Sequence, residues 1–428
     1  MKPQKQRLLS PRLLLFMGTM ILANIAAQMI FPLESLYVQE LGANVEQIGM
    51  FFTVAALAPL LLQIIGGWVS DSVGRLQAIA IGSIAGTLSY IFYLLAPSWQ
   101  WLLPSSMLNA MAVAFVAPSF QAFVAEESTP ETRGRVYGVT STLYMVVNII
   151  GPLLGGATAQ GFSFKTMYLI AGSFYATAAV VRVLMARRAR QVAHEQAQNG
   201  HAEPPPAPSF AGLKKSVAAM FGLLTAGGIL TWIFISDGVR DIAFSLIGRL
   251  VPIYLQDIAG LDLMQISVLQ SLTAIVAMAF MMPAGWLADK KGERVGIVGG
   301  FSLISIGWFI FIGAGNFWQF AVSRVIIGSG WALIDPAYSS LISKVVPEKL
   351  RGIAFGLFST SLGIISLPAP WIGARLWNTF GPTYAFYVPL IAMLAMLPVM
   401  WFKFKLPQQQ EAKASTPLVP TPVAVRVD

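Results

Sequence analysis

Long apolar runs separated by short polar turns dominate the chain. A helix needs about 20 apolar residues to cross the hydrocarbon core of a bilayer, and this length divides the sequence into twelve candidate spans. They cover residues 12–38, 46–70, 76–96, 100–125, 136–159, 165–185, 228–256, 264–288, 295–314, 317–343, 352–377 and 383–402. The pattern predicts an all-α polytopic membrane protein, because a chain in lipid must satisfy its backbone hydrogen bonds internally.

The start of the seventh span is ambiguous. Apolar sequence runs from Val217 to Tyr254, which is too long for one helix. A second span in this stretch would move the basic loop after the eighth span to the other side of the membrane. We therefore expect a single span from about residue 228, preceded by a helix that lies at the membrane interface.

Basic residues predict the orientation of these spans. The chain carries 28 Lys and Arg against 19 Asp and Glu, and most of the basic residues, Arg182 included, are assigned to loops on one side. The positive-inside rule makes that side the cytoplasm, and an even number of spans places both termini there. The basic residues form no continuous stripe, so nucleic acid is not expected as a partner. We expect a monomer in the cell membrane, surrounded by lipid.

Composition excludes several classes of protein. Hydrophobic residues make up 56% of the chain and charged residues 11%, so a water-soluble fold could not bury its apolar side chains. There is no cysteine, and the only histidines, His194 and His201, fall between the sixth and seventh spans. No phosphate-binding loop or protease motif is present. We therefore expect no catalytic residue, no metal and no cofactor, and we interpret the chain as a protein that is not an enzyme.

A polar, proline-rich stretch over residues 187–212 separates six spans from six and reads as a flexible or partly extended linker. The expected organisation is an N-terminal lobe over 1–186, a cytoplasmic linker with an interfacial helix over 187–216, a C-terminal lobe over 217–405 and a disordered cytoplasmic tail over 406–428.

The two halves are copies of one unit. The sequence GGWVSDSVGR at 66–75 matches AGWLADKKGE at 284–293, which places Asp71 and Asp289 218 residues apart. The same separation relates Pro118 to Pro336 and Pro152 to Pro370. Because each copy has an even number of spans, both have the same orientation, as in transporters built from parallel repeats.

Two motifs carry a family resemblance. The stretch GWVSDSVGR, which contains Gly67, Asp71, Gly74 and Arg75, resembles the loop signature of the major facilitator superfamily, and its second copy contains Gly285, Asp289 and Gly292. The stretch GPLLGG, which contains Gly151, Pro152, Gly155 and Gly156, is similar to the motif of the drug:proton antiporter branch. The resemblance implies two six-helix lobes around a central cavity that is lined by spans 1, 4, 7 and 10.

The loop signature has expected contacts. Glycines permit tight turns and close packing, and the resemblance implies that Asp71 accepts hydrogen bonds from the N-terminus of span 11. Arg75 is expected to pair with Glu126 or Glu127 near the end of span 4. The chain also departs from the family, because the arginine usual in span 4 of drug antiporters is missing.

Seven charged residues fall within the predicted spans and away from their ends. They are Glu34 in span 1, Asp237, Arg240, Asp241 and Arg249 in span 7, and Arg324 and Asp335 in span 10. A charge at the bilayer centre costs at least about 2.5 kcal/mol, so each of them needs water, a partner or a function. The implied cavity would supply the water.

Three of these charges share one face of span 7. Helical spacing lets Arg240 pair with Asp237, and Asp241 lies beside them. One guanidinium cannot neutralise two carboxylates, so the remaining charge must be met by a proton, a cationic substrate or a second base. The cluster is either a proton-coupling site or a structural ion cluster that holds span 7 to its neighbours.

The other charges suggest weaker pairs. Glu34 and Arg249 lie at similar depths in spans 1 and 7, and they form either an outer gate or separate interfacial contacts. Arg324 and Asp335 are eleven residues apart, about 16 Å along the helix, and therefore cannot pair with each other.

The sequence thus favours a secondary active transporter that works by alternating access, with proton-coupled efflux of amphiphilic drugs or metabolites as the leading hypothesis. An uptake carrier, or a lipid or anionic-metabolite transporter of the same fold, remains the alternative, and a channel is formally open. The expected partners are a small-molecule substrate and protons.

Overall fold

The computed structural model describes residues 10–62, 69, 73–129, 132–198, 227–346 and 363–404. Within these ranges every regular element is a helix, and the helices account for all twelve predicted spans. Ten of them are long and apolar enough to cross a membrane. Span 7 falls outside this group because it carries three charges, and span 11 because it is only partly described.

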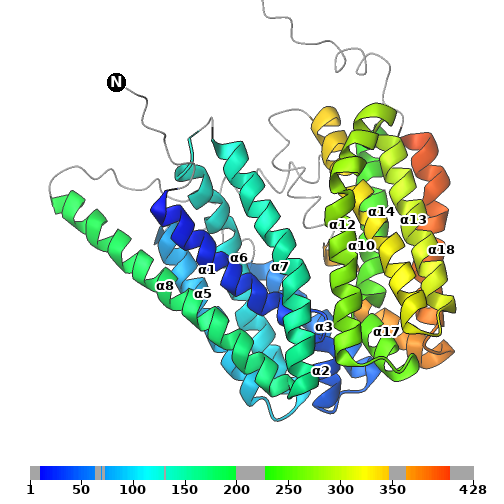
Figure 1. The fold of residues 1–428 in the computed structure, drawn as a ribbon, viewed down its shortest axis with the longest axis horizontal. Coiled ribbons are helices and arrows are strands. Elements are labelled where there is room, and N and C mark those ends of the chain that lie inside the picture. Colours follow the sequence, from blue (N-terminus) through cyan, green and yellow to red (C-terminus); the bar gives the residue numbers. More distant parts are fainter. Residues whose placement is uncertain are drawn as a thin grey trace, which may run out of the picture.

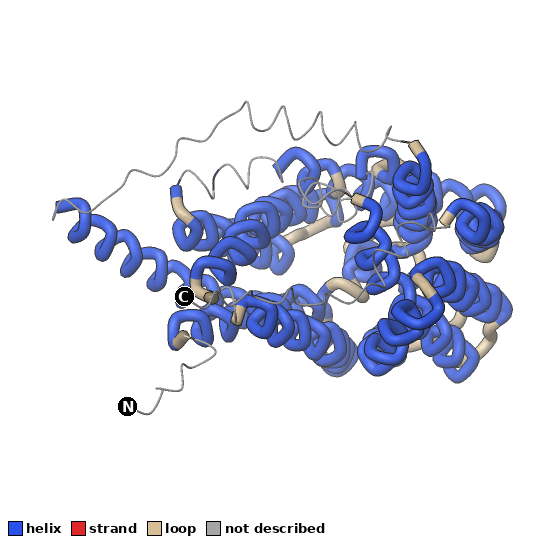
Figure 2. The backbone as a smooth tube through the Cα atoms, turned by 90° about the horizontal axis from the view of Figure 1, so that it is seen from above, coloured by secondary structure: helices blue, strands red, loops and turns tan. Residues whose placement is uncertain are grey.

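The helices form two bundles that lie side by side (Figures 1 and 2). The first contains α1 (Pro11–Ile30), α2 (Glu34–Glu40), α3 (Val45–Ala55), α5 (Arg75–Leu95), a short 3-10 turn (Trp99–Trp101), α6 (Leu102–Glu126), α7 (Arg133–Gly161) and α8 (Phe164–Gln198). The second contains α10 (Gly228–Gly248), α11 (Val251–Ile253), a π-helical turn (Tyr254–Ile258), α12 (Leu263–Lys291), α13 (Glu293–Gly313), α14 (Phe317–Val345), α16 (Gly363–Ser366), α17 (Ala369–Phe380) and α18 (Tyr384–Lys403). The ambiguous seventh span begins at Gly228, where the sequence predicts it.

The bundles converge at the end where α2, α3 and α17 lie, which we call the closed end, and diverge toward the opposite, linker end (Figure 1). Among the contacts that join them near the closed end, two involve glycines. Gly49 on α3 packs directly on Ala374 of α17, and Gly156 on α7 packs on Ser267 of α12. The repeat separation of 218 residues relates Gly49 to Ser267 and Gly156 to Ala374, so these two contacts are copies of each other.

Local structure repeats in the same way. Capping boxes open α3 and α12 at equivalent positions, Asn44 with Gln47 and Asp262 with Gln265, each satisfying two backbone N–H groups. Gly74 and Gly292, at the starts of α5 and α13, both have a positive φ, 96° and 86°. Only glycine adopts this conformation without strain, which explains these two glycines of the loop signature.

Spans 1 and 7 are each broken rather than continuous, contrary to the single helices that we expected. The first helix of each lobe ends at equivalent positions, Ile30 in α1 and Gly248 in α10. Pro32 and Pro252 follow these ends, and proline removes a backbone donor and clashes with the preceding turn. The residues just after α1 and α10, Phe31 and Arg249, therefore lie at equivalent breaks.

A helix continues into the predicted linker, contrary to the flexible or partly extended start that we expected. Helix α8 continues to Gln198, well past residue 187. The stretch from Ala186 to Gln198 is rich in Ala, Arg, Gln and Glu, which are strong helix formers, and the proline run begins only at Pro204. Residues 199–226, including the expected interfacial helix, lie outside the described part of the chain.

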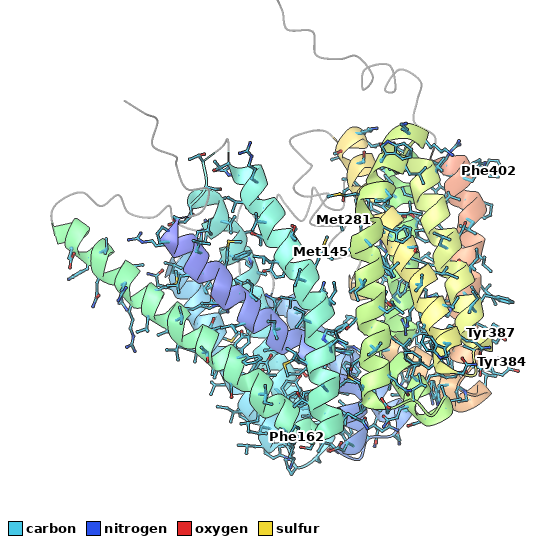
Figure 3. All side chains as sticks on the ribbon, in the orientation of Figure 1. Met145, Phe162, Met281, Tyr384, Tyr387 and Phe402 are labelled. Atoms are coloured by element: carbon cyan, nitrogen blue, oxygen red, sulfur yellow. The ribbon has the colours of Figure 1, made fainter. Side chains whose placement is uncertain are left out.

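Apolar side chains cover the outer surface of the bundles. Tyr384, Tyr387 and Phe402 project from α18 away from the other helices (Figure 3) and are 58%, 40% and 67% exposed. Such a surface is stable in lipid but not in water. Met145 on α7 and Met281 on α12 instead face the space between the bundles.

Candidate functional site

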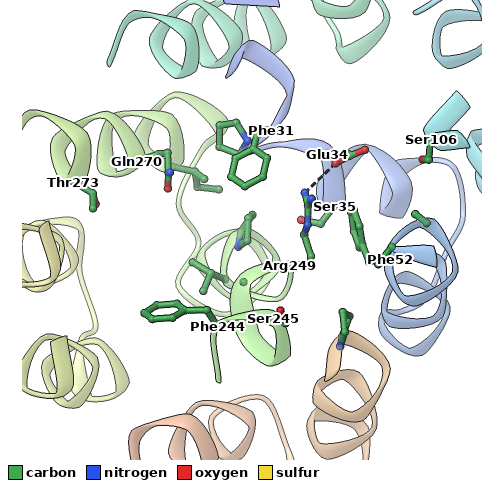
Figure 4. A pocket seen from close by; sticks show the side chains of 18 of the residues that line it. Phe31, Glu34, Ser35, Phe52, Ser106, Phe244, Ser245, Arg249, Gln270 and Thr273 are labelled. Atoms are coloured by element: carbon green, nitrogen blue, oxygen red, sulfur yellow. Dashed lines mark hydrogen bonds and ion pairs between the residues drawn. The ribbon is translucent and has the colours of Figure 1, made fainter. Parts of the chain in front are cut away.

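A cavity of about 720 Å³ lies between the lobes, and Figure 4 shows part of its lining. Four of the seven charged residues expected within spans line it: Glu34, Asp241, Arg249 and Arg324. Asp237 and Arg240 are buried and do not line it, and Asp335 is an exposed residue of α14. The structure therefore collects most of these charges around one space.

The three charges on α10 form one cluster. Arg240 makes a close ion pair with Asp237, and its Nη2 lies 3.6 Å from an oxygen of Asp241. The guanidinium also stacks on Trp331 and Tyr338 of α14, with its carbon 5.5 and 5.7 Å from the ring centres. Asp237 is 1% exposed, whereas 31% of the Asp241 side chain is exposed. The two carboxylates thus differ: Asp237 is sealed in protein and Asp241 reaches the cavity.

Glu34 and Arg249 form the predicted contact between lobes. Arg249 Nη1 lies 2.9 Å from Glu34 Oε2 (Figure 4). Tyr93 donates a hydrogen bond of 2.9 Å to the other oxygen of Glu34. The guanidinium stacks on Phe31 and Phe52, 4.8 and 4.1 Å from the ring centres. The ion pair therefore connects the helix breaks of spans 1 and 7 and joins the two lobes at the wall of the cavity.

We expect Glu34→Gln to open the closed end more often. The change leaves Arg249 without its carboxylate, and a hydrogen bond to a charged group contributes about 1.5–3 kcal/mol. A Ser35→Cys label, whose position lines the cavity, should react severalfold faster with a membrane-impermeant thiol reagent added at the closed end. The chain has no cysteine of its own to interfere.

Arg375→Gln is the matched control for that experiment. Arg375 forms an ion pair of 3.3 Å with Glu46 between α17 and α3, but the two side chains are 61% and 42% exposed. Exposed pairs contribute little, so labelling should stay near the wild-type rate. Equal rates for both variants would show that Glu34 does not hold this end closed.

Arg324 and Asp335 have no ion-pair partner among the described residues. The acidic partners of the ion pairs in this part of the chain are Glu34, Glu46, Glu126, Asp237, Asp241 and Glu293, and none of them bonds Arg324. The Arg324 guanidinium instead packs on the rings of Trp308 and Phe311, 5.8 and 5.5 Å from their centres. No local spacing in the sequence predicts these aromatic neighbours, because they lie on another helix.

The loop signature makes one of its expected contacts. Arg75 Nε lies 3.3 Å from Glu126 Oε1. In the second lobe the equivalent positions are Glu293 and Lys344, which also form an ion pair, with the charges exchanged. Gly67 and Asp71 lie outside the described residues, as does the side chain of Asp289, so their expected contacts are not described. A methyl group at Gly285 would meet open space.

The glycines of the span 5 motif bring helices into direct contact. A methyl group at Gly151 would overlap Gln28 of α1, and one at Gly155 would overlap the carbonyl group of Met29. One at Gly156 would instead overlap Ser267 in the other lobe. Pro152 lies inside α7 between them. Neighbouring glycines of one motif therefore serve two different interfaces.

The cytoplasmic assignment of Arg182 is wrong. Its side chain is 1% exposed inside the first lobe, where it donates hydrogen bonds to Thr19 and to Ser83 Oγ, 3.1 Å each. Position 182 lies near the end of its span, where an arginine usually extends to the interface. The signal in the sequence is small, namely short hydroxyl side chains in spans 1 and 3. Arg182 does not line the cavity.

Metal ligands do not gather in the described ranges, where no three histidine, aspartate or glutamate side chains form a group that could hold an ion.

Comparisons with known proteins agree with the fold. The sequence matches the family model of the Major Facilitator Superfamily over residues 15–239 and 233–426. It is 24% identical over 377 residues to the multi-drug resistance efflux pump PmrA of Streptococcus pneumoniae, covering 86% of this chain and 89% of that protein. It is 22% identical to multidrug resistance protein 1 of Bacillus subtilis, covering 89% and 93%.

A solved structure shows the same architecture. A POT family transporter in complex with 5-aminolevulinic acid superposes with a TM-score of 0.68 at 14% identity, covering 91% of this chain and 95% of that one. At this identity the likeness establishes the fold alone. Two matches to one family model, one for each lobe, agree with the internal repeat.

The chain is thus a multi-pass membrane transporter with two six-helix lobes around a central cavity, and not an enzyme. It belongs to the Major Facilitator Superfamily.

Proposed function

We propose that this transporter exports amphiphilic drugs or metabolites and that protons bound in the cavity drive the export. The relatives described above support the substrate class, because their names refer to multidrug efflux and resistance. The two-lobe fold supports alternating access, in which the lobes close one end of the cavity and then the other.

The main support for proton coupling is the position of Asp241. It is the carboxylate of the α10 cluster that reaches the cavity, and it competes with Asp237 for one guanidinium. The cluster retains a net charge of minus one, which a proton or a cationic substrate can balance. The membrane potential supplies about 2.3 kcal/mol per charge per 100 mV, enough for roughly a fiftyfold gradient of a neutral solute.

The expected topology completes the proposal. Basic residues favour cytoplasmic termini, a monomer suffices for one cavity, and the segments 1–186 and 217–405 act as the moving lobes, joined by the linker. In that orientation the closed end faces outward. The conformation described would then be the one that is open to the cytoplasm, ready to take up substrate from the cell interior.

Transport by Asp241→Asn tests the assignment. In liposomes with an imposed pH gradient, we expect wild type to move ethidium against its concentration gradient and Asp241→Asn to lose this movement at least about tenfold. Exchange of ethidium at equal pH should persist in the variant, because exchange needs no net proton transfer. Undiminished gradient-driven movement in Asp241→Asn would remove Asp241 from the coupling mechanism.

A further inference from the structure

Arg324 is a buried cation that faces the cavity without an acidic partner among the described residues. The residue is 8% exposed and lines the cavity. Its Nε is buried and makes no hydrogen bond within the described part of the chain. A guanidinium at this depth costs several kcal/mol unless it meets an anion or water. The aromatic rings of Trp308 and Phe311 hold the group in place but do not neutralise it.

The acidic residues that line the cavity interact with groups other than Arg324. Glu34 bonds Arg249 and Tyr93, and Asp241 lies beside Arg240. Trp331 packs against Arg240 and so marks the depth of the α10 cluster. Seven residues separate it from Arg324 on α14, which is about 10 Å along the helix axis. The cavity therefore has a negative region and a positive region at different depths of the same wall.

Aromatic side chains connect the two regions. The ring of Phe244 lies 4.8 Å from that of Trp331 and 6.5 Å from that of Trp308, and all three residues line the cavity. From α12, Gln270 and Thr273 add neutral polar groups to the lining (Figure 4). A planar apolar body can pack along these rings, with an anionic group at Arg324.

We propose that Arg324 is an anion subsite of the cavity and binds the carboxylate of aromatic organic anions and zwitterions. Guanidinium groups bind carboxylates through charge-assisted, often bidentate hydrogen bonds. A zwitterionic substrate would also place its cationic group toward Asp241. The inference rests on the proposed function, since it defines a class of substrate for the same cavity.

Two dyes that differ at one group test the subsite. Rhodamine B carries a free carboxylate, and rhodamine B ethyl ester has the same ring system with the carboxylate esterified. Equilibrium binding to purified full-length protein, followed by fluorescence polarisation, should show that Arg324→Gln weakens rhodamine B at least about tenfold. The ester should change less than about twofold. Arg324→Lys, which keeps the charge, should retain most of the rhodamine B affinity.

Arg182→Gln is the matched control, because Arg182 is also a buried guanidinium without a described carboxylate partner but lies outside the cavity. It should leave the ratio of the two dye affinities unchanged. Equal weakening of both dyes by Arg324→Gln, or weaker binding of rhodamine B than of its ester by wild type, would overturn the subsite. Transport of the ester under a pH gradient is measured separately, so that the proposed export can stand when the subsite fails.

Discussion

Replacing Asp237 with asparagine is expected to destabilise the protein by about 3–5 kcal/mol, the cost of breaking a buried ion pair. Asp237 is 1% exposed and pairs closely with Arg240. The amide removes the closest carboxylate from a guanidinium in the protein interior and leaves it beside Asp241, at 3.6 Å. The midpoint of thermal unfolding in detergent should fall by several degrees, and expression should fall with it.

Two further variants separate charge from packing. Asp241→Asn, one turn away, removes a carboxylate whose side chain is 31% exposed, and we expect a much smaller loss of stability. The double variant Asp237→Asn with Arg240→Gln removes both buried charges and should recover part of the loss, because the charge that remains in the cluster, Asp241, is partly exposed to the cavity. If Asp237→Asn and Asp241→Asn prove equally stable, the distinction between a structural and a functional carboxylate is wrong.

Gly155→Ala and Gly156→Ala should have different effects although the residues are neighbours. The new methyl group at 155 overlaps the backbone of α1 within the same lobe. Backbone cannot move aside cheaply, so we expect at least about 1–3 kcal/mol of destabilisation in every conformation. At 156 the methyl group overlaps Ser267 of the opposite lobe, and the strain disappears when the lobes separate at the closed end.

Distance measurements distinguish these outcomes. Spin labels at Phe162→Cys and Trp318→Cys, both exposed positions after α7 and at the start of α14, report the separation of the lobes at the closed end. Gly156→Ala should raise the population with the longer distance, while Gly155→Ala should lower the unfolding midpoint with little change in that distribution. A population shift of tenfold corresponds to about 1.4 kcal/mol. The same change in both variants would contradict the assignment of the two glycines to separate interfaces.

The sequence predicts the helices and several charge contacts because these depend on local spacing. Arg240 reaches Asp237 since the two lie three residues apart on one helix. Glu34 meets Arg249 since equal depth in equivalent spans brings them together. The start of span 7 at Gly228 follows from length and loop charge.

Other features depend on tertiary packing and cannot be predicted from local spacing in the sequence. Arg182 turns into its lobe because Thr19 and Ser83 offer oxygen atoms there, and no spacing rule connects three helices. The rings that hold Arg324 lie on α13. One signal was readable in the sequence, since applying the repeat separation to Arg75 and Glu126 leads to the charge-exchanged pair in the second lobe.

The internal repeat indicates the order in which some contacts between the lobes arose. Gln39 donates a hydrogen bond of 2.7 Å to Asp257, and these residues are 218 positions apart, as are Phe31 and Arg249, which stack on each other. When a gene duplicates, such positions begin as identical residues that face one another across the axis. Two arginines or two aspartates there would repel. The hydrogen bond between Gln39 and Asp257 and the stacking of Arg249 on Phe31 could therefore arise only after the two copies had diverged, which makes these two contacts younger than the lobes that they join.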